Sequence, residues 1–179
     1  MEKYIIFEGI IEQNATQRLV QSINASIQTS PSKIVIFFSS LGGSIYEGFL
    51  LASVIQNSKI PIAIHATNHI DSIANVIYLS SKERSTESHA KFYLHGASAQ
   101  GSFDEKTLMD QLSAVRTDNS RIANYISENS KIPLKKVQSM MTNGTTISAQ
   151  EALVFEIVNR IEHREIPVTA SREEIVYVN

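Results

Sequence analysis

Three short stretches carry residue types that could perform nucleophilic chemistry. Gly42 and Gly43 separate a run of strand-forming residues from a predicted helix, Ser72 follows the next apolar run, and His95 ends a later one. A serine hydroxyl attacks a carbonyl when a histidine takes its proton, and backbone N–H groups can stabilise the resulting oxyanion. Paired glycines also form ordinary tight turns. They therefore indicate either a βα turn or a place where bare backbone faces a ligand.

The segments around these residues predict an α/β fold with a largely parallel sheet. Short apolar runs alternate with helical patterns over the first 100 residues, which is typical of βαβ units. Parallel strands bring their C-terminal ends to one edge of a sheet, so the paired glycines, Ser72 and His95 are expected to meet in one crevice. The predicted strands are 3–10, 33–38, 60–67 and 91–96, and the predicted helices between them include 44–58 and 70–81.

Other polar residues near Ser72 offer competing interpretations. His65 and His69 flank the turn before Ser72, where they could shape a pocket or titrate at the surface. Neither these nor His89 and His163 form the HxxxH or HExxH spacing of a metal site, so no metal is expected. Asp71 is expected to be a helix N-cap, because adjacent residues at a helix start point in different directions.

Composition excludes several classes of function. The chain has 179 residues, of which 42% are apolar and 19% charged, with a net charge of −2. These values suit one globular domain over 1–179, and no basic tract supports nucleic-acid binding. The absence of cysteine excludes disulfides and thiol catalysis. The apolar run at the N-terminus is too short for a signal peptide or membrane anchor, so we expect a cytoplasmic protein with no membrane association.

The second half of the chain is mainly helical. Residues 103–130 form a long amphipathic pattern, which either packs on its own domain or projects to meet another subunit. Shorter helices are predicted at 132–141 and from Ser148, whose spacing from Glu151 is that of a capping box. The tail, about 166–179, is strand-like in places. The apolar stripe of the long pattern consists of Leu108, Leu112, Val115, Ile122 and Ile126.

Four motifs, in order and at matching spacing, resemble the proteolytic subunit of the Clp protease. They are similar to its glycine-rich turn, its nucleophile segment, its histidine strand and its closing helix, and the likeness runs from about residue 4 to 162. The matching segments are FFSSLGGSIYEGF, DSIAN, KFYLHGA and TTISAQEALVFEIVNRI.

The resemblance implies a crotonase-like spiral of ββα units. The head would comprise about 1–100 and 131–165, and 103–130 would be a protruding handle helix. Subunits would form heptameric rings stacked in pairs as a homo-oligomeric tetradecamer around a closed chamber. An ATP-dependent Clp-type serine protease of this kind cleaves peptides or unfolded proteins and needs no cofactor in its proteolytic site.

The resemblance also assigns roles to single residues. Ser72 would form the acyl-enzyme and His95 would act as its general base. Backbone N–H groups of Gly43 and Ile73 would form the oxyanion hole. The paired glycines would leave room for the substrate backbone, which makes Gly42 and Ser44 substrate-binding positions.

Several positions depart from the family pattern. Gly144 stands where the family has its third catalytic residue, an Asp, so Asn143 is the nearest polar candidate for that role, with Thr145 behind it. An Asn can orient the histidine but cannot stabilise the imidazolium by charge; in a related triad this replacement costs about 10⁴-fold in kcat. Further differences are Leu41 for proline, Ile70 and Asp71 for small residues, and Ala74 and Glu156 for glycines.

These departures leave two alternatives to an active endopeptidase. One is a catalytically impaired or inactive Clp-like subunit that assembles but does not cleave. The other is an acyl-coenzyme-A enzyme on the same fold. The first strand begins by about Tyr4, without the segment that precedes it in the family. This counts against docking to a hexameric AAA+ unfoldase and predicts an axial gate that is wider or differently built.

Overall fold

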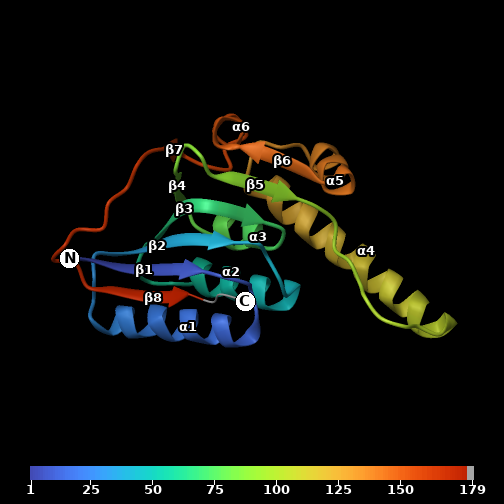
Figure 1. The fold of residues 1–179 in the computed structure, drawn as a ribbon, viewed down its shortest axis with the longest axis horizontal. Helices are drawn as coiled ribbons and strands as arrows, with labels where there is room; N and C mark the ends of the chain where they lie inside the picture. Colours follow the sequence, from blue (N-terminus) through green and yellow to red (C-terminus); the bar gives the residue numbers. More distant parts are fainter. Residues whose placement is uncertain (177–179) are drawn as a thin grey trace.

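The apolar runs of the first half form the centre of one sheet in the computed structural model, which describes residues 1–176 (Figure 1). The strand order is β6-β5-β3-β2-β1-β8, with β4 paired to both β3 and β7. The pairs are parallel except β5 with β6. The strands are β1 (Glu2–Glu8), β2 (Lys33–Ser40), β3 (Ile62–Asp71), β4 (Glu83–Thr86), β5 (Lys91–Leu94), β6 (Thr145–Ser148), β7 (Arg160–Ile161) and β8 (Arg172–Val176).

Helices connect these strands and form the core together with them. The large apolar cluster includes residues of α1, α2 and α3, whereas a smaller cluster around Val35 and Phe37 is packed by Ile166 and Ala170. Within residues 1–176, none of the helices combines the length and apolar character that a membrane span requires. The helices are α1 (Gln13–Gln28), α2 (Ile45–Gln56), α3 (Ala74–Leu79), α4 (Glu105–Glu128), α5 (Leu134–Asn143) and α6 (Ala149–Val154).

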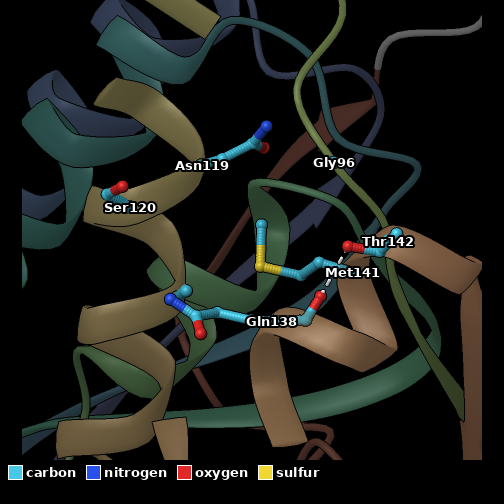
Figure 2. A pocket seen from close by; sticks show the side chains of 7 residues that line it. Gly96, Asn119, Ser120, Gln138, Met141 and Thr142 are labelled. Atoms are coloured by element: carbon cyan, nitrogen blue, oxygen red, sulfur yellow. Dashed lines mark hydrogen bonds between the residues drawn. The ribbon is translucent and has the colours of Figure 1, made fainter. Parts of the chain in front are cut away.

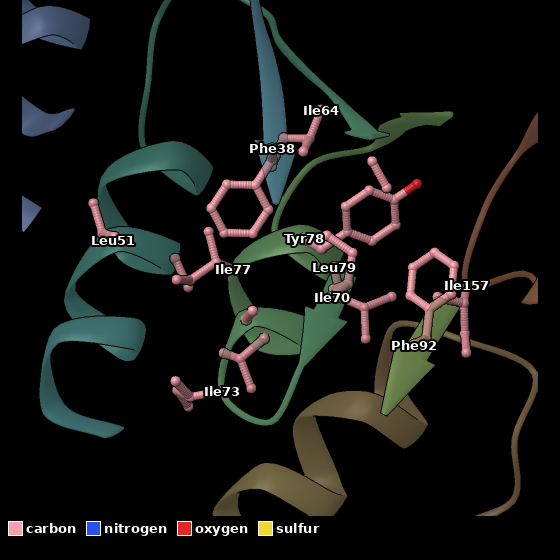
Figure 3. Packing of buried hydrophobic residues seen from close by; sticks show 14 of the residues in the cluster. Phe38, Leu51, Ile64, Ile70, Ile73, Ile77, Tyr78, Leu79, Phe92 and Ile157 are labelled. Carbon is pink, nitrogen blue, oxygen red and sulfur yellow. The ribbon is translucent and has the colours of Figure 1, made fainter. Parts of the chain in front are cut away.

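Helix α3 is wholly buried, and this anchors the turn that precedes it. All six of its residues are buried. Figure 3 shows Ile77 and Tyr78 of α3 among Phe38 of β2 and Phe92 of β5. The rings of Tyr78 and Phe92 meet edge to face, with centroids 5.4 Å apart. Close packing of this kind leaves α3 little freedom to shift relative to the sheet.

Helix α4 projects from the body of the molecule (Figure 1). Only its C-terminal part is anchored, through Ile122, Ala123 and Ile126. Leu108 and Leu112, nearer its start, are 56% and 46% exposed. The apolar stripe expected over 103–130 is therefore divided between a buried half and a half that this chain leaves uncovered.

Two expectations about local structure are wrong. β3 continues through Asp71, so Asp71 is a strand residue and not an N-cap; the N-cap position of α3 is Ile73. The reason is pairing, since Ile70 is buried and Asp71 pairs in register with Tyr93 of β5. The second concerns residues 82–90, a polar segment before β5 in which no strand was predicted. This segment contains β4, whose Ser85 is buried.

Candidate active site

Ser72 occupies a strained turn between β3 and α3. Its φ is 57°, a left-handed conformation that a serine seldom adopts and that costs about 1–3 kcal/mol unless the surroundings impose it. The Ser72 N–H donates to the carbonyl oxygen of Tyr93 at 2.8 Å. A sharp strand–turn–helix junction of this kind presents a side chain at the sheet edge, where a nucleophile must stand.

Asn75 holds this turn together. Its side-chain nitrogen lies 2.9 Å from the carbonyl oxygen of Ile70, 3.1 Å from that of Ser72 and 3.0 Å from that of Tyr93. Asn75 is 1% exposed, so water cannot replace these contacts. Asn75 is not among the site residues that the sequence predicts. The available signal was an amide in the middle of an apolar helical run.

Gly42 lies directly against Ser72. A Cβ atom placed on Gly42 would be 2.6 Å from Ser72 Cβ and 3.3 Å from Ser72 Oγ, and the Gly42 φ is 95°. On Gly43, whose φ is 145°, a Cβ would collide with the carbonyl oxygen of Ile11. Both glycines are therefore required by close approach, and the first of them faces the candidate nucleophile. The turn is more than an ordinary βα connection.

The same turn is pinned to the segment before α1. Ile11 N–H donates to the Gly42 carbonyl oxygen at 2.8 Å, and Ser44 N–H donates to the Ile11 carbonyl oxygen at 2.7 Å. Ser44 caps α2 through its side chain, which accepts from Glu47 N–H at 3.4 Å. Ser44 thus contributes structure to the turn as well as being a candidate substrate-binding position.

His95 follows β5 at the same edge of the sheet. Because Tyr93 pairs with Asp71, the residue before Ser72, His95 lies one residue beyond the strand position that is level with Ser72. Its Nδ1 is 2.8 Å from the Gly96 carbonyl oxygen. A carbonyl can only accept, so Nδ1 carries the proton and Nε2 has a free lone pair. This is the tautomer that a general base for a serine needs.

Within the described residues, no hydrogen bond joins Ser72 Oγ to His95. Such contacts commonly tighten only when substrate binds. Asn143, the last residue of α5, is exposed, and its amide nitrogen is 3.4 Å from the Ser139 hydroxyl of the same helix. The structure therefore brings Gly42 against Ser72 and carries His95 to the same edge, while Asn143 faces its own helix.

Asp71, the residue before the candidate nucleophile, has its carboxylate next to His69. One of its carboxylate oxygens is 3.3 Å from His69 Nδ1, and the other is buried without a hydrogen-bond partner among the described residues. His65 is not at the surface: it is fully buried, with Nδ1 2.9 Å from Ser85 Oγ and Nε2 3.2 Å from Glu87 Oε1. Burial lowers the pKa of His65. Both histidines therefore have polar partners other than Ser72.

A cavity of about 360 Å³ opens beside Gly96, between α4 and α5 (Figure 2). Asn119 and Ser120 reach it from α4, and Gln138, Met141 and Thr142 from α5. Asn119 Oδ1 accepts from Ala97 N–H at 2.7 Å, which fixes the chain just after His95. Both helices line the cavity with polar and apolar side chains, the apolar ones being Ala123 of α4 and Met141 of α5.

Comparisons with known proteins agree with this geometry. A family model described as Clp protease matches residues 1–165. Two curated relatives, each named ATP-dependent Clp protease proteolytic subunit 3, come from Rhizobium etli and Rhizobium meliloti; each is 23% identical over 159 residues, which cover 88% of this chain and 82% of the relative. The fold matches that of a mutant of ClpP1 from Listeria monocytogenes with a TM-score of 0.83 and 19% identity, over 90% of this chain and 92% of the other.

Proposed function

The chain belongs to the Clp protease family of serine peptidases, and we propose that it cleaves peptide bonds through an acyl-enzyme on Ser72. The observation that carries this assignment is the strained turn at Ser72 with Gly42 packed against it. Among the described residues, Ser30 and Glu156 also have a positive φ, but Ser72 is the one that lies against the paired glycines. Such strain is characteristic of functional positions.

The proposed reaction follows the Ser–His scheme. His95 Nε2 takes the hydroxyl proton while Ser72 Oγ attacks the scissile carbonyl carbon, and the carbonyl oxygen becomes an oxyanion. Backbone N–H groups of Gly43 and Ile73 are proposed to stabilise that oxyanion. His95 then gives the proton to the leaving amine, the C–N bond breaks and an ester on Ser72 remains. A water molecule, deprotonated by His95, hydrolyses the ester.

Substrate and third-residue roles are part of the proposal. Gly42 and Ser44 would border the substrate backbone, and the cavity beside Gly96 would receive a substrate side chain. Asn143 stays the proposed polar partner of His95 at the third position, which requires its amide to leave Ser139. That partner supplies orientation but no negative charge, so we expect turnover to be slow.

Assembly follows from family membership. Clp protease family members form oligomeric rings and act on peptides, and we propose paired heptameric rings for this chain, with α4 interleaving between them. The exposed leucines in the projecting half of α4 support this arrangement. The relatives are named ATP-dependent. An unfoldase partner is implied by that name for those relatives and is not carried over to this chain; we propose a cytoplasmic location and peptides or unfolded proteins as its substrates.

Peptidase assays on three variants test this function. Ser72→Ala and His95→Ala should each lower kcat by at least about 10³-fold. Ser98→Ala, which alters an exposed serine after β5, should leave activity unchanged. Full activity in a folded Ser72→Ala variant would refute the assignment. Inactivity of the wild-type chain would instead favour a structural subunit.

A further inference from the structure

Tyr93 contacts the candidate base and the turn that holds the candidate nucleophile. Its ring stacks on the imidazole of His95, with centroids 5.0 Å apart and planes inclined by 27°. Its carbonyl oxygen accepts from the Ser72 N–H and lies 3.0 Å from the Asn75 amide nitrogen. Its hydroxyl reaches Gly144, where a Cβ atom would be 2.8 Å from the hydroxyl oxygen. One strand residue therefore touches the nucleophile's turn, the base and the start of β6.

The contacts of His95 explain why this stack matters. Its Nδ1 is held by the Gly96 carbonyl oxygen, and one hydrogen bond leaves the ring free to rotate about that contact. The Tyr93 ring, stacked on one face of the imidazole, removes this freedom. Among the described residues, no carboxylate contacts His95. Asp71 is the acid beside Tyr93 on β3, and it is paired with His69. On the other side of Tyr93, β6 contributes Thr146, which carries no charge.

We propose that Tyr93 is a positioning residue for His95, with its ring orienting the imidazole from one face, in addition to the polar partner proposed at the third position. This inference rests on the proposed function, because it assigns Tyr93 the orienting task for the same base. An aromatic face attracts a cation more weakly than a carboxylate does. The orientation is therefore retained while the charge stabilisation is reduced.

The position of Gly144 follows from the same contact. Gly144 ends α5 with a φ of 65° and faces the Tyr93 hydroxyl. A side chain at 144 and a tyrosine at 93 compete for one space. Asp tolerates a left-handed φ better than most residues, so the Tyr93 hydroxyl, more than the backbone, excludes it. Without that hydroxyl, the atoms of residue 93 nearest to a Cβ atom on residue 144 are two ring carbons at 3.6 Å, an ordinary van der Waals distance.

The first test compares Tyr93→Phe, which keeps the ring, with Tyr93→Leu, which removes it, and with Tyr46→Leu, a matched change at an exposed position of α2. We expect Tyr93→Leu to lower kcat about 10- to 100-fold with KM within twofold, since small losses of alignment have effects of this size. Tyr93→Phe and Tyr46→Leu should retain kcat within threefold.

An NMR readout separates this inference from the proposed function. With histidine labelled in the ring and His95→Asn used for assignment, the ring of Tyr93 should shift the His95 resonance upfield in the wild type and in Tyr93→Phe. Tyr93→Leu should abolish that shift. These results require no turnover, so they hold even if Ser72 is inactive. An unchanged His95 resonance in Tyr93→Leu would overturn the inference, as would unchanged kcat in a folded variant.

A double variant tests the competition for space. Gly144→Asp alone should lose activity and stability through collision with the Tyr93 hydroxyl. In the Tyr93→Phe background the same substitution should cost at least fivefold less activity, a coupling that independent sites would not show. Equal losses in both backgrounds would contradict the proposed contact.

Discussion

Gly42 and Ser72 lie in contact although they belong to turns that follow different strands. A Cβ atom on Gly42 would lie only 2.6 Å from the Cβ of Ser72, so the contact leaves no room for a side chain. The turn after β2 and the turn after β3 thus form one surface at the sheet edge. The proposed oxyanion hole and nucleophile share this surface.

Gly42→Ala should damage the site more than the fold. Its methyl group would meet Ser72 and the Asp71 carbonyl oxygen, at a φ that an alanine tolerates poorly. We expect kcat/KM to fall by at least about 10²-fold and the free energy of unfolding by about 1–3 kcal/mol. Leu41→Ala, an adjacent exposed position, should change neither quantity more than slightly. Near-wild-type turnover by Gly42→Ala would show that Gly42 does not border the reacting atoms.

Asn75→Asp should be more harmful than its small change of shape suggests. The substitution replaces an amide donor with a carboxylate oxygen among three carbonyl oxygens, all of them acceptors. We expect unfolding free energy to fall by at least about 1–3 kcal/mol, the cost of unsatisfied buried groups. Asn57→Asp is the matched control, since the Asn57 amide bonds Ser53 at an exposed helix end. Urea denaturation that shows equal losses in the two variants would rule out the role given to Asn75.

Stability should fall on acidification because of a buried cluster far from the catalytic edge. Burial lowers the pKa of His65, so the unfolded chain binds a proton more readily as the pH falls through about 6.5. Partial burial acts to raise the pKa of Glu87, but hydrogen bonds from His65, the Arg164 N–H and His163 hold it below its usual value. The stability that ionised Glu87 contributes is therefore lost at lower pH, as the pH falls below the pKa that Glu87 has in the unfolded chain.

His65→Gln removes the first of these titrations and keeps a polar side chain. We expect the unfolding free energy of the wild type to decrease from pH 7.5 to 5.5, with each unit of pKa difference worth about 1.4 kcal/mol. The decrease should be smaller in the variant. Chemical denaturation at several pH values measures it, and parallel profiles would exclude His65 as the source.

Glu156 holds a left-handed conformation with a φ of 52°, just after α6. Glycine suits that position better, so Glu156→Gly should raise the unfolding free energy by up to about 1 kcal/mol. The exposed ion pair with Lys131 is lost in the exchange and contributes little. Glu156→Ala loses the same ion pair but keeps the strain, so it should not be stabilised. If thermal unfolding shows Glu156→Ala to be more stable than Glu156→Gly, the backbone strain at residue 156 is not significant.

The projecting half of α4 should carry the contact between rings. Leu112→Glu places a charge in its exposed apolar stripe and should convert large assemblies into smaller ones during analytical ultracentrifugation. Ser113→Glu adds the same charge one residue along, on a different side of the helix, and should sediment like the wild type. Wild-type size for a folded Leu112→Glu variant would argue that this surface is uncovered in the assembly.

Elements with a strong local signal, such as an apolar run or a capping box, were predictable from the sequence. β2 contains the apolar run 34–38 and β3 begins with the apolar run 62–64, and the Ser148–Glu151 capping box forms at the start of α6 as its spacing predicts. β4 was hidden because its buried Ser85 and Thr86 are polar and depend on partners such as His65. Pairing across strands decided that Asp71 continues β3, and helical periodicity carries no information on such pairing.

The sequence predicted the candidate reacting groups of the site but not the residues that hold them in place. A serine after a strand and a histidine after the next apolar strand carry a spacing signal. Asn75 and Tyr93 act through a carbonyl cluster and a ring stack, which arise only when β3 and β5 lie side by side. Their residue types alone are equally compatible with ordinary helix and strand positions.

Covalent labelling tests the central claim most directly. Fluorophosphonates react with serines whose hydroxyl is activated, whatever the peptide preference of the enzyme, and intact-mass spectrometry counts the adducts. We predict a single adduct on the wild-type chain that is absent from Ser72→Ala and strongly reduced in His95→Ala. A folded oligomer that takes up no probe, or an adduct that persists in Ser72→Ala, would contradict the assignment of Ser72 as the nucleophile.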